Sequence, residues 1–449
     1  MHLILGFGAT GASYLRYLNK KNIPSFIVDS RKNPPGLLEF KSLKEKDLFL
    51  GKFNPEVLNQ VETILVSPGV DYRNEILVSA REKGIEIVTD IEIFTKESKS
   101  TKLLITGTNG KTSVVKMLGH VLNEIYQNKK VVCCGNIGTP VLDTLSEKQD
   151  ISVIEVSSFH LEHSNDLKSD VGVLLNVEQD HLDRHLSFET YKKIKERILL
   201  NSRAGLATKE VLRSIGCESE GERLFRILPK GGMAFNFEDV TNPFVRDIYE
   251  FFLELDNWPL HEIVNIKSVL SVVLVLETLK GEEEITGIFL EELVSRCLES
   301  LISFKRLRHR YEVLGLRKGM TYINDSKSTN ISSLLTAINS TERKYGKNKV
   351  VLICGGDSKG QDFSKIENSS LESVKKILIF GKDKENIFKD IGDKADCLQV
   401  IDLEDAVNKS RTFGTKGDVV LLSPSCASTD MFLDYRERGD KFRELSGFN

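Results

Sequence analysis

Short apolar runs recur along almost the whole chain, and amphipathic segments separate them. The runs are rich in β-branched residues; they include LILGFG at 3–8, SFIVDS at 25–30, LLITGTNG at 103–110 and VVLICGG at 350–356. Near-continuous apolar strands that alternate with helices are typical of parallel sheets covered on both faces. The pattern therefore predicts an α/β fold.

Three of the expected strands end in glycine-bearing loops that lie far apart in the sequence, at Gly6, Gly107 and Gly355. In open α/β sheets ligands bind beyond the carboxyl ends of the strands. We therefore expect three α/β domains, each with its own ligand loop. Polar stretches at 95–102 and 299–310 suggest domains at 1–97, 98–301 and 302–449.

Composition narrows the class of protein. A chain of 449 residues with 40% hydrophobic and 28% charged residues is expected to be globular and multidomain. A net charge of −3 does not favour a nucleic-acid partner. The seven cysteines include no CxxC pair, which indicates reduced thiols. The first residues do not resemble a signal peptide, and the longest apolar run is too short to cross a bilayer, so we expect a cytoplasmic protein.

The stretch LLITGTNGKTSVVKMLGHVL combines a strand, a loop and a helix that starts near Thr112. Gly107 and Gly110 allow the backbone to approach phosphate, Lys111 adds charge, and the Thr112 hydroxyl is a Mg²⁺ ligand type. The loop is a variant, because Ile105 stands where the standard phosphate loop has glycine. A purely structural turn with a chance lysine is the alternative.

Two further strand ends carry oxygen and imidazole groups. Glu155 ends one apolar run, and Asp180, His181, Asp183 and His185 follow another. Such groups suit Mg²⁺ or Mn²⁺ with phosphate oxygens as the remaining ligands. Each histidine alone fits a capping or core role equally well.

The N-terminal run places Gly6, Gly8 and Gly11 on a G-x-G-x-x-G pattern, with Asp29 at the end of the next strand. Alone this is a weak indication of dinucleotide binding, with NAD as the usual ligand. No dehydrogenase-like catalytic set follows it, and a second nucleotide loop is present at Gly107.

TGTNGKT at 106–112 resembles the phosphate loop of the Mur ligases and of their folylpolyglutamate synthase relatives. The resemblance extends over nearly the whole chain, through SPG at 67–69, CGNIG at 134–138 and LLSPSCASTDMFLDYRERGDKF at 421–442. It implies a Rossmann-like N-terminal domain, a central P-loop ATPase-like domain and a Rossmann-like C-terminal domain. The last stretch resembles the D-glutamate-adding branch of the family.

The resemblance implies an ATP-dependent ligase of peptidoglycan synthesis that makes an amide bond through an acyl phosphate. Its partners would be the small molecules ATP, D-glutamate and UDP-N-acetylmuramoyl-L-alanine, with Mg²⁺ (or Mn²⁺) as cofactor. Nucleic acid and membrane are not expected as partners, and we expect a monomer.

Site residues follow from the same resemblance, position by position. Those expected to bind ATP are Gly107, Thr108, Asn109, Gly110, Lys111, Thr112, Ser113, Asn265, Arg310 and Asp325. Those expected to bind the uridine substrate are Ala9, Thr10, Gly11, Asp29, Ser30, Arg31, Ser67, Gly69, Asn136 and His181. Those expected to bind D-glutamate are Thr329, Lys359, Ser428 and Tyr435. The implied metal ligands are Thr112, Glu155, His181 and Lys195, the last as a carbamate, and the implied catalytic residues are Lys111, His181 and Lys195.

The sequence departs from the family at two places. His261 is followed by Glu262 where the family usually has asparagine, although Asn265 is present; Tyr435 stands where phenylalanine also occurs. Folylpolyglutamate synthases lack a uridine-nucleotide domain before the loop, and the motifs DNPR and THGKT of the diaminopimelate- and alanine-adding branches are absent. A nucleotide-binding scaffold without chemistry and an NAD dehydrogenase are the remaining alternatives.

Overall fold

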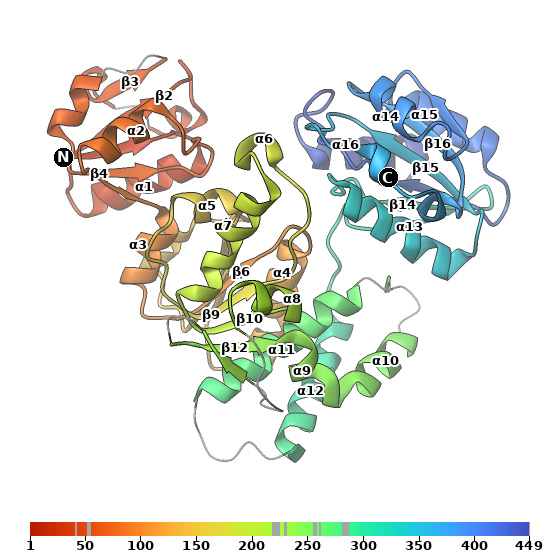
Figure 1. Ribbon diagram of the computed structural model, residues 1–449, viewed down its shortest axis with the longest axis horizontal. Coiled ribbons are helices and arrows are strands. Elements are labelled where there is room, and N and C mark those ends of the chain that lie inside the picture. The colour runs from red at the N-terminus through yellow and green to blue at the C-terminus, as the bar shows by residue number, and fades with distance from the viewer. Residues whose placement is uncertain are drawn as a thin grey trace. The chain divides into compact units, whose positions relative to one another are not determined.

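The computed structural model describes residues 1–40, 43–51, 55–217, 225–228, 231–254, 258–259, 262–280 and 287–448 (Figure 1). The chain forms two compact units. The first comprises Met1–Val177, Glu189–Val245 and Ile266–Ile302, and the second comprises Glu178–Phe188, Arg246–Asn265 and Ser303–Asn449. His261, named above beside the adenine site, lies outside the described residues.

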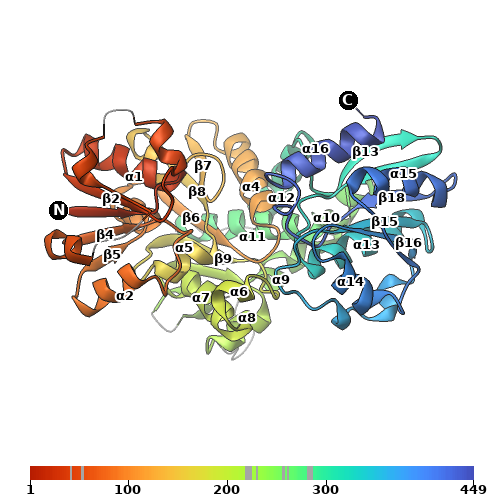
Figure 2. The same cartoon turned by 90° about the horizontal axis from the view of Figure 1, so that it is seen from above.

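The first unit begins with a five-stranded sheet of order β3-β2-β1-β4-β5, in which every pair is parallel. Its strands are β1 (His2–Leu5), β2 (Ser25–Asp29), β3 (Leu48–Leu50), β4 (Thr63–Val66) and β5 (Glu86–Val88). Figure 2 shows α1 (Ala9–Lys20) and α2 (Glu75–Glu82) on opposite faces of this sheet. Alternate strand residues explain this: Ile4 packs in one buried cluster with Tyr14 of α1, and Leu3 in another with Leu77 of α2.

The second sheet of this unit has the order β11-β12-β10-β9-β6-β8-β7. Its strands are β6 (Thr101–Thr106), β7 (Val131–Gly135), β8 (Ile151–Glu155), β9 (Ser169–Leu174), β10 (Ser202–Ala207), β11 (Phe225–Ile227) and β12 (Met233–Asn236). Helices of residues 90–302 are α3 (Asp90–Glu97), α4 (Lys111–Ile125), α5 (Ser158–His163), α6 (Leu182–His185), α7 (Phe188–Leu200), α8 (Lys209–Ser214), α9 (Phe237–Thr241), α10 (Val245–Glu254), α11 (Glu262–Lys280) and α12 (Gly287–Ile302).

The second unit contains a six-stranded sheet of order β13-β14-β18-β15-β16-β17. Its strands are β13 (Glu312–Arg317), β14 (Met320–Asn324), β15 (Val350–Gly355), β16 (Val374–Phe380), β17 (Cys397–Gln399) and β18 (Val419–Leu422). The helices α13 (Ile331–Tyr345) and α14 (Lys384–Ile391) share one buried cluster with the sheet, and α15 (Leu403–Phe413) and α16 (Tyr435–Ser446) share another. Neighbouring residues of one strand belong to different clusters, Leu352 to the first and Ile353 to the second, so both faces of the sheet are covered.

The structure confirms the α/β class with three sheets, and the expected parallel pairing holds except at one edge of the second sheet and one edge of the third. Strands β11 and β12 are antiparallel, and so are β13 and β14. A two-residue turn joins β13 to β14, and both of its residues have positive φ, 51° at Lys318 and 80° at Gly319. Two-residue turns with positive φ match the right-handed twist of the strands in a hairpin. The turn is specified by the Lys-Gly pair, and the spacing of apolar residues gives no information about it.

All seven cysteines are free thiols, as the absence of a disulfide pattern predicts. Within the described ranges, no helix is both long and apolar enough to cross a membrane.

Candidate active site

The phosphate loop joins β6 to α4. Gly110 has a φ of 82° and caps α4, which begins at Lys111, one residue before the predicted start. The Lys111 amine donates to the carbonyl oxygens of Gly107 at 2.6 Å and Thr108 at 2.8 Å. The lysine therefore lies across the loop, at the helix N-terminus where backbone amides favour an anion.

Asn176, which was not among the predicted site residues, holds the phosphate loop from the end of the neighbouring strand β9. The Thr108 amide donates to the carbonyl oxygen of Asn176 at 3.0 Å, and the Asn109 amide donates to its side-chain oxygen at 2.8 Å. The hydroxyls of Thr108 and Tyr191 are 3.0 Å apart. Asn176 could have been suspected from its place directly after an apolar run, but only strand order brings it to this loop, since β9 pairs with β6.

Glu155 is a buried carboxylate, 2% exposed, beside the loop. One of its oxygens accepts from the Thr112 hydroxyl at 2.8 Å, and the other accepts from the Asn136 amide at 2.9 Å. Within the described part of the chain no cationic side chain forms an ion pair with it. A buried carboxylate needs a counter-charge, so an oxygen-ligated divalent cation fits Thr112 and Glu155.

Lys195, on α7, lies beside the loop and is 1% exposed. Its amine donates to the Gly107 carbonyl at 2.9 Å, lies 3.4 Å from the Thr106 hydroxyl, and is 4.8 Å from the centre of the Tyr191 ring. Lys193 of the same helix is exposed and pairs with Glu189 at 3.5 Å. Lys193 therefore belongs to the solvent-exposed charged face of α7, whereas Lys195 does not.

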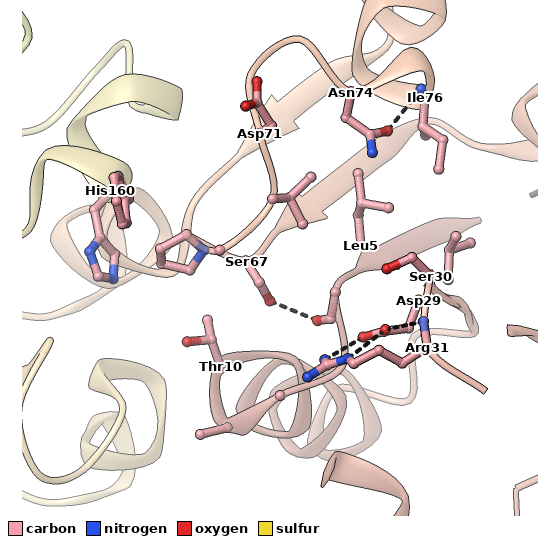
Figure 3. A pocket seen from close by; sticks show the side chains of 18 of the residues that line it. Leu5, Thr10, Asp29, Ser30, Arg31, Ser67, Asp71, Asn74, Ile76 and His160 are labelled. Atoms are coloured by element: carbon pink, nitrogen blue, oxygen red, sulfur yellow. Dashed lines mark hydrogen bonds and ion pairs between the residues drawn. The ribbon is translucent and has the colours of Figure 1, made fainter. Parts of the chain in front are cut away.

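A pocket of about 1040 Å³ opens at the carboxyl ends of β1, β2 and β4 (Figure 3). The residues predicted for the uridine substrate that line it are Ala9, Thr10, Asp29, Ser30, Arg31, Ser67, Gly69 and Asn136. Gly11 does not line it; a Cβ at that position would be 2.3 Å from the Gly6 carbonyl oxygen, so glycine lets α1 approach β1 closely. Since Asn136 also contacts Glu155, one end of the pocket leads to the phosphate loop.

Asp29 forms part of the pocket wall, held by Arg31. The Arg31 guanidinium donates to both carboxylate oxygens, at 2.8 and 2.7 Å, and the Phe7 amide donates at 2.7 Å. Burial alone would raise the pKa of Asp29, but these hydrogen bonds outweigh it and lower the pKa. Figure 3 shows the pair at the end of β2, opposite Ser67.

His160 also lines the pocket and was not singled out in the sequence. Its Nδ1 is 2.6 Å from the Ser157 hydroxyl, and its Nε2 is 3.8 Å from a carboxylate oxygen of Asp90. Burial lowers the pKa of His160 to about 3 and raises that of Asp90 to about 7. The wall behind the pocket therefore holds a neutral imidazole beside a carboxyl that titrates near neutrality.

Asp90→Asn is expected to alter the pH dependence of stability. An unfolded aspartate has a pKa of about 3.9, so between about pH 4 and 7 the folded wild type binds a proton that the unfolded chain does not. Wild-type stability therefore falls as pH rises through this window, whereas asparagine stays neutral. The variant should be more stable than wild type at pH 8, by on the order of 1–3 kcal/mol, and equal to it near pH 4. Urea denaturation at both pH values tests this; an equal difference at both would contradict it.

In the second unit, Arg310 and Asp325 lie near each other. Asp325 accepts hydrogen bonds from the Tyr311 amide and the Ser423 hydroxyl, both at 3.0 Å. Burial raises the pKa of Asp325 to about 7, and these bonds and the charge of Arg310 oppose the rise. Asn265 is on α11, where its amide donates to Glu262 at 2.5 Å.

The four residues predicted for D-glutamate follow strands or begin a helix in the same unit. Thr329 follows β14, Lys359 follows β15, Ser428 follows β18 and Tyr435 begins α16. Because β14, β18 and β15 are neighbours in the sheet, their carboxyl ends meet at one edge. Lys359 is exposed and Ser428 is buried.

His181 belongs to the second unit, whereas Thr112, Glu155 and Lys195 belong to the first. Its Nε2 is 3.7 Å from Asp180, and its φ is 52°. No group of three or more His, Cys, Asp or Glu side chains that could hold a metal occurs among the residues with described positions. The shared metal role of His181 stays a prediction.

Three domain families match the chain in order. The Mur ligase MurD-like N-terminal domain matches residues 1–89, the Mur ligase middle domain matches 105–209, and the Mur ligase glutamate ligase domain matches 309–426. With the relatives described next, these matches show that the chain belongs to the Mur ligase family.

Curated relatives named UDP-N-acetylmuramoylalanine–D-glutamate ligase are similar over nearly full length. The one from Shewanella oneidensis is 35% identical and is matched over 98% of this chain and 97% of its own. The one from Pseudomonas aeruginosa is 30% identical, over 98% and 96%.

Solved structures share the fold at lower identity. UDP-N-acetylmuramate–alanine ligase from Thermotoga maritima has a TM-score of 0.55 and 13% identity, over 99% of this chain and 98% of its own. The MurF ligase from Thermotoga maritima, solved in complex with ADP, has a TM-score of 0.54 and 16% identity, over 99% and 93%.

Proposed function

We propose that this chain is an ATP-dependent ligase that joins D-glutamate to UDP-N-acetylmuramoyl-L-alanine in peptidoglycan synthesis. The observation that carries the proposal is the similarity, over 98% of the chain, to ligases of that name. The continuous path from the N-terminal pocket through Asn136 and Glu155 to the phosphate loop supports it. We further propose a monomer that acts in the cytoplasm.

The pocket receives the uridine substrate. Amides around Ala9 and Thr10, at the start of α1, bind the diphosphate, because a helix N-terminus favours an anion. Asp29 and Arg31 stand at the uracil end, where their mutual hydrogen bonds fix both side chains. Asn136 contacts the L-alanyl end of the substrate. The reacting carboxylate of the substrate therefore approaches the phosphate loop.

Phosphoryl transfer then takes place at the loop. The L-alanyl carboxylate attacks the γ-phosphorus of ATP, and the bond from this phosphorus to the β,γ-bridging oxygen breaks. The products are ADP and an acyl phosphate. Lys111, released from the loop carbonyls, neutralises the charge on the transferring phosphoryl group. Thr112, Glu155 and His181 would hold magnesium, which would supply further positive charge to the phosphate oxygens.

Amide formation completes the reaction. The amine of D-glutamate attacks the acyl carbon, and the tetrahedral intermediate releases inorganic phosphate. Lys359, on an exposed loop, pairs with a carboxylate of D-glutamate, and Thr329, Ser428 and Tyr435 line its site. Arg310, Asp325 and Asn265 bind ATP. Lys195 acts as a carbamate: its buried neutral amine adds to CO₂ and loses a proton, and the resulting anion would bind a second metal ion.

The function is tested by phosphate release from ATP with UDP-N-acetylmuramoyl-L-alanine and a panel of amino acids. Release should require both the uridine substrate and D-glutamate, and the product should carry one new amide bond by mass spectrometry. L-Glutamate and D-aspartate are matched controls for configuration and length. Stimulation by another amino acid and not by D-glutamate would overturn the specificity, and NAD reduction without ATP use would overturn the class.

A further inference from the structure

Two side chains connect the loops that follow neighbouring strands of the C-terminal sheet. Strands β14, β18 and β15 are adjacent, and every pair among them is parallel. Their three following loops therefore lie at one edge, where ligands bind in such sheets. Gln361 and Arg438 each make hydrogen bonds to more than one of these loops.

Gln361 is half-buried and uses both ends of its amide. Its two N–H groups are shared among three carbonyl oxygens, those of Thr329 at 3.3 Å, Ser358 at 3.0 Å and Ser425 at 3.0 Å from the nitrogen. Its oxygen accepts from the amide of Ile331, at the start of α13, at 2.9 Å. One side chain thus connects the loops after β14, β15 and β18.

Arg438 is fully buried on α16. Its Nε donates to the Ser326 hydroxyl at 3.0 Å, and its Nη2 donates to the carbonyls of Ser326 at 2.8 Å and Cys426 at 3.1 Å. The Ser326 hydroxyl in turn donates to the carbonyl of Tyr435 at 2.8 Å. This network connects the loops after β14 and β18 to the start of α16.

The chemistry of Arg438 suits a positioning role. No carboxylate pairs with it in the described part of the chain, and all of its acceptors are carbonyl or hydroxyl oxygens. Its Nη1 has no hydrogen-bond partner among the described residues, and a Cβ built at Gly356 would be 3.4 Å from it. Burying an uncompensated cation is costly, so stability is a poor reason for its presence. Its bonds instead fix the mutual distances of the loops.

We propose that Gln361 and Arg438 are positioning residues for the amino-acid substrate, which set the spacing of the loops that carry Thr329, Lys359 and Ser428. The inference rests on the proposed function, because it assigns D-glutamate to these loops. Neither side chain needs to touch D-glutamate. Each acts through main-chain carbonyls, so its loss shifts the loops that form the site.

Gln361→Ala is the sharper test, since a half-buried amide can be removed without emptying the core. The KM for D-glutamate should rise about 10- to 100-fold, because small displacements of a binding group have effects of this size. The KM values for ATP and UDP-N-acetylmuramoyl-L-alanine should stay as in wild type, and the melting temperature should fall by no more than about 5–10 °C, because the lost hydrogen bonds lie at the edge of one sheet. Gln399→Ala, at the end of β17 two strands away from β15, is the matched control and should leave all three KM values unchanged.

Arg438→Lys and Arg438→Met separate charge from geometry. Lysine keeps the positive charge and methionine does not, and neither has the planar guanidinium group. Both variants should therefore raise the KM for D-glutamate. Lys441→Met, on the same helix, is the control and should leave this KM unchanged. An unchanged KM for D-glutamate in Gln361→Ala would overturn the inference, as would an equal rise for all three substrates. If the Arg438 variants fail to fold, Gln361→Ala decides. A wild-type enzyme without D-glutamate-dependent phosphate release would overturn the proposed function instead.

Discussion

Lys111→Met should lower the rate of ligation by about 10³-fold or more, because Lys111 is the cation of the phosphate loop and its amine lies against the loop carbonyls. Its charge is expected to stabilise the transferring phosphoryl group. Methionine is unbranched like lysine, is one atom shorter and carries no charge, so the fold of β6 and α4 should persist. The rate of phosphate release under saturating substrates measures the loss, and the melting temperature reports on folding.

Lys116→Met is the matched control, because Lys116 lies on the same helix and outside the loop. It should retain wild-type activity within about twofold. A Lys111→Met protein that keeps more than about a tenth of the wild-type rate would mean that another group neutralises the transferring phosphoryl charge.

Lys195→Ala should reduce activity by a factor of about 10² to 10³, and short carboxylic acids such as acetate should restore part of it. The reason is the proposed carbamate: a small carboxylate that enters the vacated space supplies the anion that the alanine variant lacks. Because Lys195 is buried beside Gly107, the space left by truncation lies next to the phosphate loop. The measurement is phosphate release as a function of added acetate, with chloride at equal ionic strength as control.

Lys192→Ala serves as the matched variant, since Lys192 is on the same helix and its amine lies 4.0 Å from Glu196. It should show neither the loss nor the rescue. Loss of activity in Lys195→Ala that no carboxylate restores would favour a different role, in which the Lys195 ammonium braces the loop through the Gly107 carbonyl. Full activity in Lys195→Ala would exclude both roles.

Local sequence was sufficient for the parts of the site that are contiguous. The phosphate loop needs only a strand, two glycines and a helix start, and Gly110 indeed takes the left-handed conformation that caps α4. The N-terminal pocket was predictable for a related reason. Parallel strands present their carboxyl ends at one edge, so the residues after β1, β2 and β4 had to meet there.

The remaining contacts depend on pairings between distant segments. Asn176 reaches the phosphate loop because β9 pairs with β6, and Gln361 reaches Thr329 because β14 and β15 flank β18. The partnership of His160 and Asp90 joins α5 to the start of α3. None of these residues belongs to a motif, and their side-chain types are common in loops. The antiparallel hairpin β13–β14 was missed because its signal is turn chemistry and not apolar periodicity.

The single carboxylate of Glu155 accepts one hydrogen bond from the pocket and one from the phosphate loop. A ligand that takes the hydrogen bond of the Asn136 amide leaves one oxygen of Glu155 without a donor. The carboxylate then interacts more strongly with the Thr112 hydroxyl or with a cation. The converse holds for a nucleotide that engages Thr112. If the uridine substrate engages Asn136 and the nucleotide engages Thr112, as proposed above, thermodynamic linkage makes these two effects equal in free energy, and the affinity for each of these two substrates would depend on the presence of the other.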